Sequence, residues 1–358
     1  MTVIARLLTR MILMRFVVIL LGIGLFVLTL DVLTNLDDIL AYGEGDPWVV
    51  LRYAGLRLPQ VAATFWNLSV LLAVLLTLVE LGYRNEIVAI WAAGVSPLQL
   101  LVMLLPLGIA LGTAQFLLND QATPRTAREL RDWGVGDYAT KKLQLGEKAP
   151  IWMRAGHDIL RAGRTNRKAT ALEDVTIFRR DEEGLLLEQI IARTARLVNG
   201  RWVLRDVYIY ARDNVRPQKL DTLIYSGNLR MAATGARSGD PEEMTLSDLS
   251  YFIANAGFGI RPAYVYEAWW HKRISLFVLA WLVMAACMPL AARYRRGGVA
   301  GHVFGMGVAI GFGYFILDGL AMTIGEQGLV PPWMAAWLPA VVLGLIATAL
   351  LLRAETLA

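Results

Sequence analysis

Six long apolar runs constrain this chain of 358 residues more than any other feature. A helix rises about 1.5 Å per residue, so each run is long enough to cross roughly 30 Å of hydrocarbon. The chain is also 56% hydrophobic, whereas roughly 45–50% is usual for a soluble protein. The sequence therefore predicts six membrane spans, near residues 11–33, 60–81, 97–118, 274–292, 299–324 and 333–352.

The polar segment between the third and fourth spans predicts a separate β domain. Its alternating or β-branched stretches are separated by turn residues, and Asn199-Gly200 between two of them is typical of a β-hairpin. Strict alternation after that turn places two sets of residues on opposite faces of one strand. The first set is Trp202, Leu204, Tyr208 and Tyr210, and the second is Val203, Val207 and Ile209.

These features predict an α+β membrane protein in three parts. Residues 1–135 hold spans one to three, residues 136–245 form the β domain, and residues 246–358 hold a connecting helix and spans four to six. The single cysteine, Cys287, excludes an intrachain disulfide. The β domain must therefore be held together by its core alone.

The placement of charge predicts that both termini lie in the cytoplasm, because short loops rich in Arg and Lys tend to stay inside. In this orientation the inner segments hold Arg6, Arg10, Arg84, Arg293, Arg295, Arg296 and Arg353. The loop after the first span then lies outside and is acidic, with Arg52 and Arg57 as exceptions. The first span is too long for a cleaved signal peptide, so we expect a signal anchor in the inner membrane and a periplasmic β domain.

A short cytoplasmic segment between spans two and three predicts a coupling helix. Asn85 is a good N-cap, and Glu86 lies in the first turn, where the helix dipole favours a carboxylate. Ile90 and Trp91 are expected to need burial that a short loop does not supply, and Gly94 permits close contact. These residues indicate docking to a cytoplasmic partner. The alternative is an ordinary loop helix with an N-terminal carboxylate.

Two further sets of residues are candidates for lipid contact or helix packing. Arg125, Arg128 and Arg131 share one face of a helix after span three, which suits either interfacial anchoring or recognition of phosphate. Asp318 in span five is an intramembrane carboxylate, which by default marks a bundle interior or a water pathway. Small residues in the same span predict a helix interface at Gly301, Gly305, Gly307 and Gly311.

The sequence carries no motif of an enzyme. It has no P-loop string and no G-x-S-x-G elbow, and its three histidines lie in different segments without the spacing of metal ligands. We therefore expect no catalytic residue, no metal site, no cofactor in this chain and no binding of nucleic acid. Any ATP chemistry, with its Mg, must come from another chain.

Three features resemble the lipopolysaccharide-export permeases of the LptF/LptG family. They are the segment from Glu80 through NEIVAIWAAGVSP, the arrangement of three spans on each side of a β domain, and GFGYFILDG followed by Pro331-Pro332-Trp333 and Leu338-Pro339. The string in span five and the short C-terminus are more similar to LptG than to LptF. The resemblance covers nearly the whole chain.

The resemblance implies a subunit of an ABC exporter that extracts lipopolysaccharide from the inner membrane. Its partners would be an LptF-like permease in a heterodimer, an LptB-like ATPase dimer, and LptC-like and LptA-like bridge proteins. The β domain would be jellyroll-like and would receive the lipid. Glu86 would occupy the ATPase groove, and Arg128 and Arg131 would line the lipid cavity. The family's lysines at the outer end of span one are replaced here by Asp37 and Asp38, so Arg52 and Arg57 are candidates for the phosphate role. The alternatives are a lipid with fewer phosphates and divalent cations that bridge acidic groups.

Two other functions fit parts of this pattern. An ABC permease for lipoproteins or other small amphiphiles would share the membrane location, but such permeases use four spans with the outer domain after the first. A membrane-anchored enzyme or sensor that acts on lipids would need a cluster of polar residues at one membrane depth, and none is apparent in the sequence.

Overall fold

A computed structural model describes residues 3–136, 138, 151–155, 157–165, 171–212, 216–227, 240–254, 261–290 and 300–355. The chain forms two compact units, which are described separately here. The first comprises residues 1–127 and 268–358, and the second comprises residues 128–267. The predicted boundaries at 135/136 and 245/246 stay a prediction. Arg293, Arg295 and Arg296, which support the predicted orientation, lie outside the described residues.

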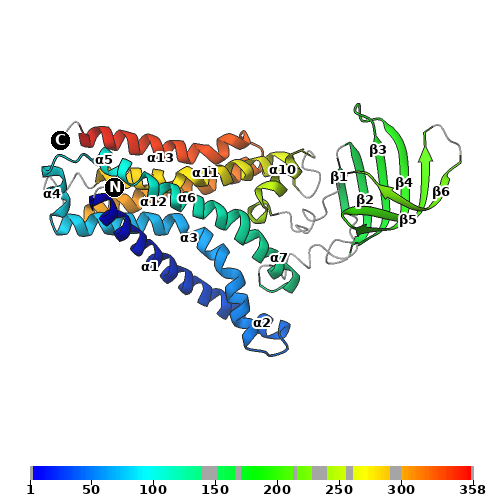
Figure 1. The fold of residues 1–358 in the computed structure, drawn as a ribbon, viewed down its shortest axis with the longest axis horizontal. Helices are drawn as coiled ribbons and strands as arrows, with labels where there is room; N and C mark the ends of the chain where they lie inside the picture. Colours follow the sequence, from blue (N-terminus) through cyan, green and yellow to red (C-terminus); the bar gives the residue numbers. More distant parts are fainter. Residues whose placement is uncertain are drawn as a thin grey trace. The chain divides into compact units, whose positions relative to one another are not determined.

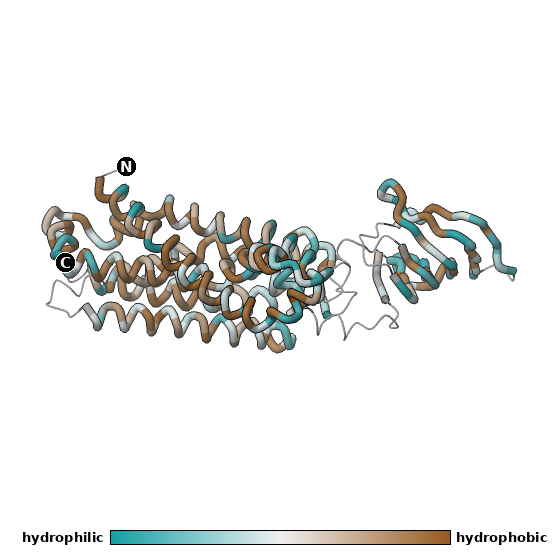
Figure 2. Tube along the Cα trace, turned by 90° about the horizontal axis from the view of Figure 1, so that it is seen from below, coloured by the Kyte–Doolittle hydropathy of each residue, from teal (hydrophilic) through white to brown (hydrophobic). Residues whose placement is uncertain are grey.

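Long apolar helices make up the first unit (Figures 1 and 2). Among the described residues, five helices are individually long and apolar enough to cross a membrane, and counting the bent pair Glu86–Ala92 and Pro97–Met103 as one span raises the number to six. The predicted α+β membrane class is therefore confirmed. The helices of this unit are α1 (Val3–Thr34), α2 (Leu36–Tyr42), α3 (Trp48–Tyr83), α4 (Glu86–Ala92), α5 (Pro97–Met103), α6 (Leu105–Leu117), the π-helix η1 (Leu118–Ala122), α12 (Ala300–Glu326), α13 (Pro332–Glu355) and most of α11 (Ala263–Cys287).

The third predicted span is built from two helices, α5 and α6, with Leu104 between them. Pro106 lies in the first turn of α6 and has no N–H to donate to the carbonyl four residues before it, which explains the interruption. Span four was predicted to begin at residue 274, but α11 begins at Ala263. Lys272 and Arg273 therefore lie within this helix, before the predicted apolar run.

The helices pack around one continuous apolar core. Leu8, Ile12 and Phe16 of α1 join residues of α3, α5, α6, α11 and α12 in this core. The ring of Phe16 meets that of Trp66 edge-on, with 4.8 Å between the ring centroids. Because α1 packs chiefly against α3, the rest of its surface stays apolar and exposed, as suits a lipid-facing span.

The second unit contains a six-stranded antiparallel sheet in which consecutive strands are neighbours (Figure 1). Its strands are β1 (Ile151–Ala155), β2 (Asp158–Thr165), β3 (Ala171–Arg180), β4 (Leu186–Val198), β5 (Arg201–Ala211) and β6 (Gln218–Tyr225). The predicted hairpin is present, because Val198 pairs with Arg201 around Asn199 and Gly200, which have φ of 49° and 76°. The described strands follow one up-and-down sheet, and this order differs from the two sheets of a jellyroll.

Helical segments of the second unit are α7 (Thr123–Trp133), the 3₁₀ turn η2 (Pro241–Glu243) and α10 (Leu246–Ala254). Helix α7 continues from η1 as predicted, and its first residues belong to the first unit. Helix α10 is the predicted connecting helix before span four.

Along each strand, buried and exposed side chains alternate, but this alternation shifts by one residue where the strands cross one transverse row. This shift keeps the apolar side chains on one face of the sheet. The strand pairings have the same register on both sides of this row. Asp174 and Asp206 of the row have φ of 52° and 53°, so the backbone leaves the extended region there. The row consists of Gly163, Asp174, Arg193, Asp206 and Asp221.

The prediction of strict alternation on β5 was therefore wrong. Trp202 and Leu204 are buried before the row, and Val207 is buried after it, all in the same core. Tyr208 and Tyr210 are exposed instead of sharing the face of Leu204. The sheet is also strongly curled, since the Tyr225 hydroxyl on β6 donates a hydrogen bond of 2.8 Å to Asp158 Oδ2 on β2. Burial raises the pKa of Tyr225 and keeps this hydroxyl protonated as a donor.

Candidate functional site

Helix α4 presents Glu86 at its first position. Its axis and that of α5 are bent by 105° at the Gly94 turn, where φ is 82°. The Glu86 side chain is 45% exposed, and its Oε1 lies 4.0 Å from Arg84 Nη1. Asn85 was predicted to cap this helix. It has a left-handed backbone instead, with φ of 58°, and makes no side-chain cap hydrogen bond. The predicted cap was therefore wrong.

The apolar side of α4 is already covered by this chain. Ile87 and Trp91 are 1% and 4% exposed, and Ile90 packs against the same core. The expectation that Ile90 and Trp91 need a partner for burial was therefore wrong, because the neighbouring spans bury them. The surface that remains open is formed by Glu86, Val88, Ala89, Ala92 and Ala93, with Tyr83 just before the helix. We call these six residues the α4 surface.

Charged side chains connect α4 with the first two spans. Arg15 of α1 forms an ion pair with Glu80 of α3. Glu80 Oε1 also lies 2.7 Å from Arg84 Nη2, one helical turn further along. In the sequence, Glu80 stands out only as the start of the segment that resembles the permease family, and its pairing with Arg15 was not predicted. Residues 65 positions apart along a chain give no local signal of such a contact.

The three arginines of α7 differ in their surroundings. Arg125 is exposed and donates a hydrogen bond of 3.0 Å to Gln121 Oε1. Arg128 Nη2 lies 3.1 Å from Asp248 Oδ2 at a largely exposed site. Arg131 Nη2 lies 2.5 Å from Glu243 Oε2, and Tyr138 donates to the other oxygen of this carboxylate at 2.8 Å. Contact of Arg131 with a lipid phosphate would therefore compete with a buried carboxylate.

The two candidate arginines near the start of α3 also differ. Arg52 is exposed. Arg57 Nε lies 3.3 Å from Asp31 Oδ2 of α1, and its Nη1 donates a hydrogen bond of 2.6 Å to Gln60 Oε1. Tyr53 donates to the same Asp31 oxygen at 2.9 Å. Arg52 is thus the more exposed of the two.

Asp318 lies at a polar cluster that the sequence did not reveal. It forms an ion pair with Lys272 of α11, and Tyr314 donates a hydrogen bond of 3.2 Å to Asp318 Oδ1. The next residue, Arg273, is buried and donates to the backbone carbonyl of Asn119 in η1. No such cluster was apparent in the sequence, whereas the structure brings Lys272, Tyr314 and Asp318 together. Here the cluster joins α11 to α12 and to the end of the third span.

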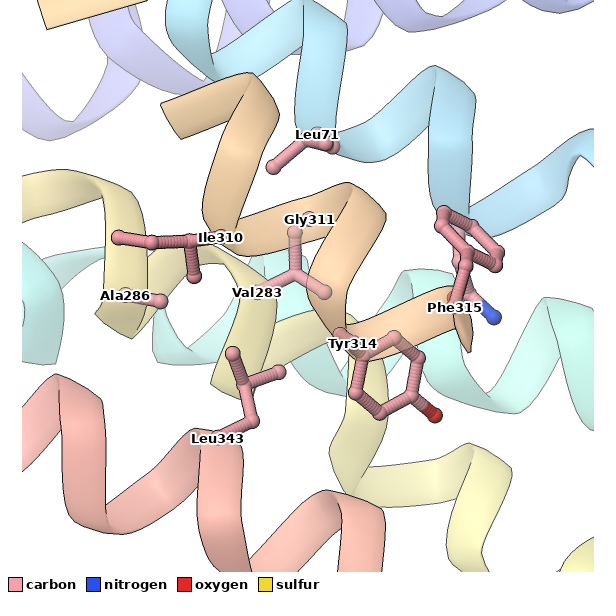
Figure 3. Close-up of a pocket in the computed structure, with 9 residues that line it drawn as sticks. Leu71, Val283, Ala286, Ile310, Gly311, Tyr314, Phe315 and Leu343 are labelled. Carbon is pink, nitrogen blue, oxygen red and sulfur yellow. The ribbon is translucent and has the colours of Figure 1, made fainter. Parts of the chain in front are cut away.

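The four glycines of α12 that were predicted to form a helix interface separate into two pairs. A Cβ atom at Gly307 or Gly311 would collide with the side chains of Leu75 and Leu71 of α3, so these two glycines permit the close approach of α3 and α12. A Cβ at Gly301 or Gly305 would meet nothing within 4 Å. Gly311 also lines a small cavity of about 10 Å³ (Figure 3), whose wall includes Leu71, Val283, Tyr314 and Leu343.

The apolar face of the curled sheet is a candidate surface for acyl chains. Alternate residues from β2 to β6 contribute to it, in the two phases separated by the transverse row. We call the following residues the sheet core: Leu160, Ala162, Leu172, Val175, Ile177, Ile190, Ala192, Ala195, Trp202, Leu204, Val207 and Tyr225. Among the described residues, no group of three or more His, Cys, Asp or Glu could hold a metal ion.

Comparison with known proteins gives consistent matches over nearly the whole chain. The sequence profile of the family described as "Lipopolysaccharide export system permease LptF/LptG" matches residues 6–353. The "Lipopolysaccharide export system permease protein LptG" of Escherichia coli strain K12 is 22% identical over 345 residues, which cover 91% of this chain and 94% of the relative. The protein of the same name from Escherichia coli O6:H1 matches to the same extent.

Proposed function

This chain belongs to the LptF/LptG family of lipopolysaccharide export permeases, and from that premise we propose that it is the LptG-like subunit of an ABC exporter. It is an inner-membrane transport subunit and not itself an enzyme. The resemblance seen in the sequence is thereby confirmed over nearly the whole chain. The observation that carries this conclusion is the family match over residues 6–353, together with apolar helices before and after the β-strands along the chain.

We propose that the exporter consists of this chain, an LptF-like permease and a dimer of an LptB-like ATPase, which binds the ATP and Mg. LptC-like and LptA-like proteins would form the bridge that accepts the lipid. The chain itself has no P-loop motif, which supports a separate ATPase. Both termini would lie in the cytoplasm and the sheet in the periplasm, as the Arg and Lys asymmetry favours.

The α4 surface is the proposed ATPase-docking site. Tyr83 is 84% exposed, and Glu86 offers a carboxylate beside it. Ala89, Ala92 and Ala93 are exposed and small, so another chain can approach the helix backbone closely. The opposite side of α4 is fixed by the burial of Ile87 and Trp91, which makes this short helix a rigid extension of the membrane core.

We propose that the arginines near the outer ends of the spans recognise the phosphates of lipopolysaccharide. Arg52 and Arg125 are exposed, which supports a direct contact. Arg57, Arg128 and Arg131 are engaged with Asp31, Asp248 and Glu243, respectively. A phosphate would have to compete with these carboxylates. Each of these three arginines would therefore bind a phosphate only after it leaves its carboxylate partner.

Co-purification and lipid export test the proposal together. Glu86→Lys is expected to leave membrane insertion intact but to weaken binding of the ATPase, since removal of one partner of a buried charged contact costs about 2–5 kcal/mol. Glu86→Gln separates the loss of charge from its reversal. Glu44→Lys makes the same charge change in the predicted outer loop and serves as the control. Undiminished co-purification of the Glu86→Lys chain with an ATPase, with undiminished export, would contradict the proposed docking site.

A further inference from the structure

A line of charged side chains links the proposed docking helix to the first span. It begins at Glu86 in α4, passes through Arg84 and Glu80, and ends at Arg15 in α1. Glu80 is the branch point, because its two oxygens are shared between Arg15 and Arg84. Two cations therefore compete for one carboxylate at the cytoplasmic ends of the spans.

The contacts become weaker from the Arg15 end of this line toward the Glu86 end. Side-chain exposure is 22% for Arg15 and 32% for Glu80, but 61% for Arg84. Exposed ion pairs are screened by water and contribute little, whereas partly buried pairs are screened less. The separation of 4.0 Å between Arg84 and Glu86 is also the longest in this line. The contact nearest the docking surface is thus the one that a partner exchanges most easily.

Helix α3 is the route by which α4 reaches α1. Helix α1 packs chiefly against α3, and its outer end is held there by Asp31 with Arg57 and Tyr53. The inner attachment is not saturated, since Arg15 Nη1 is buried without a hydrogen-bond partner among the described residues. A buried ion pair that is incompletely satisfied is weak evidence for stability. The geometry of the Arg15–Glu80 pair therefore favours a contact that changes during transport over one that only stabilises the fold.

We propose that Glu80 is a positioning residue that couples the state of the ATPase-docking helix to span one. Engagement of Glu86 by a cationic group of the ATPase withdraws its carboxylate from Arg84. Arg84 then binds Glu80 more fully, and Glu80 holds Arg15 less firmly, so that α1 is released from α3 at its inner end. This inference rests on the proposed function, because it requires an ATPase at the α4 surface.

The simplest alternative is that Glu80 only neutralises Arg15 within the bilayer. The two roles make different predictions for the paired change Arg15→Gln/Glu80→Gln, which removes both charges and keeps polar side chains of similar size. Under neutralisation alone, this double variant exports as the unmodified chain does. Under coupling, it loses export because the ionic link is gone.

The test reconstitutes the complete exporter in proteoliposomes and measures lipopolysaccharide exported per ATP hydrolysed. We expect this ratio to fall at least about fivefold in Arg15→Gln and in the double variant, the lower end of a typical coupling between sites. Co-purification with the ATPase should persist in both. Arg10→Gln removes a cation from the same helix at an exposed position and should leave the ratio unchanged. Arg84 is predicted to lie in the cytoplasmic segment, so Arg84→Gln should not disturb membrane insertion. This variant should lower the ratio of lipopolysaccharide exported to ATP hydrolysed even if the Arg15 variants fail to insert.

The outcomes separate this inference from the proposed function. If the unmodified chain neither binds an ATPase nor exports lipopolysaccharide, the proposed function fails. If the unmodified chain and Arg10→Gln export normally and the double variant matches them, the coupling role of Glu80 is overturned while the proposed function stands. An undiminished ratio in Arg84→Gln would overturn it equally.

Discussion

Charges in the membrane unit are held in pairs that different helices contribute. Arg15 meets Glu80, Arg57 meets Asp31, and Lys272 meets Asp318. An unpaired charge in a bilayer is costly, so each pair limits how the spans can separate. The candidate lipid-binding arginines Arg128 and Arg131 are also paired with carboxylates, but the two pairs differ in how deeply they are buried. This difference in burial can be tested.

Arg131 and Arg128 should differ in their effect on stability. Arg131→Ala leaves Glu243 charged at a side-chain exposure of 4%, and such an uncompensated buried charge costs about 3–5 kcal/mol. Arg128→Ala breaks a pair in which the arginine is 46% exposed, which is worth about 0–1 kcal/mol. Thermal unfolding in detergent would measure the difference. Restoration of stability by Glu243→Gln in the Arg131→Ala background is the expected control, and equal effects of the two arginine changes would contradict the buried pairing.

At the scale of the elements, local sequence patterns were sufficient to predict the spans and the hairpin but not their contacts. Apolar length identifies a span without reference to any other helix, and Asn199-Gly200 encodes its own turn. The faces of β5 required more, because alternation holds only while every residue stays extended. Asp206 interrupts the apolar pattern in the sequence, and this was the available signal of the phase change.

The same limit applies to the candidate site. The exposed position of Glu86 agrees with a helix whose first turn carries a carboxylate. Trp91 is buried in a core that distant spans such as α11 and α12 also build, so a local argument assigned its apolar surface to a partner. Lys272 was missed as the partner of Asp318 because the apolar run of span four begins after it.

The glycines of α12 should separate by the helix that they face. Gly311→Ala forces its new methyl group against Leu71, and overpacking of this kind typically costs about 1–3 kcal/mol. Gly305→Ala meets nothing within 4 Å and should be neutral or slightly stabilising. Thermal unfolding of the purified chain is the measurement. Leu71→Ala should recover part of the loss in Gly311→Ala, and an additive loss in this pair would show that the two residues do not meet.

For the whole molecule, the orientation in the membrane remains a prediction that labelling can decide. With Cys287 replaced by Ala, a cysteine at Glu183 in the exposed β3–β4 turn should react with an impermeant thiol reagent in intact spheroplasts. A cysteine at Arg353 should react only after the membrane is opened, because the C-terminus is predicted to be cytoplasmic. The opposite pattern would place the sheet in the cytoplasm and would overturn the predicted path of the lipid.

The final prediction concerns how acyl chains cross water at the sheet. Each CH₂ group exposed to water costs about 0.8 kcal/mol, so several long chains together make an unassisted crossing prohibitive. A carrier must offer them a continuous apolar surface. The sheet core is such a surface, and the Tyr225–Asp158 hydrogen bond keeps the sheet curled around it. The change of phase at Asp206 matters here, since it brings Leu204 and Val207 onto one face.

A photo-crosslinking amino acid placed at four positions of β5 would test this role. Val207 is 0% exposed and Tyr208, the next residue, is 38% exposed on the opposite face, so these two form a matched pair. We expect ATP-dependent lipopolysaccharide adducts at Leu204 and Val207, with far fewer at Tyr208 and Tyr210. Adducts shared by Leu204 and Tyr208 would support strict alternation and contradict the phase change. If no position gives adducts, the sheet core stays closed to lipid during transport, and the sheet then serves as a docking platform for the next protein of the bridge.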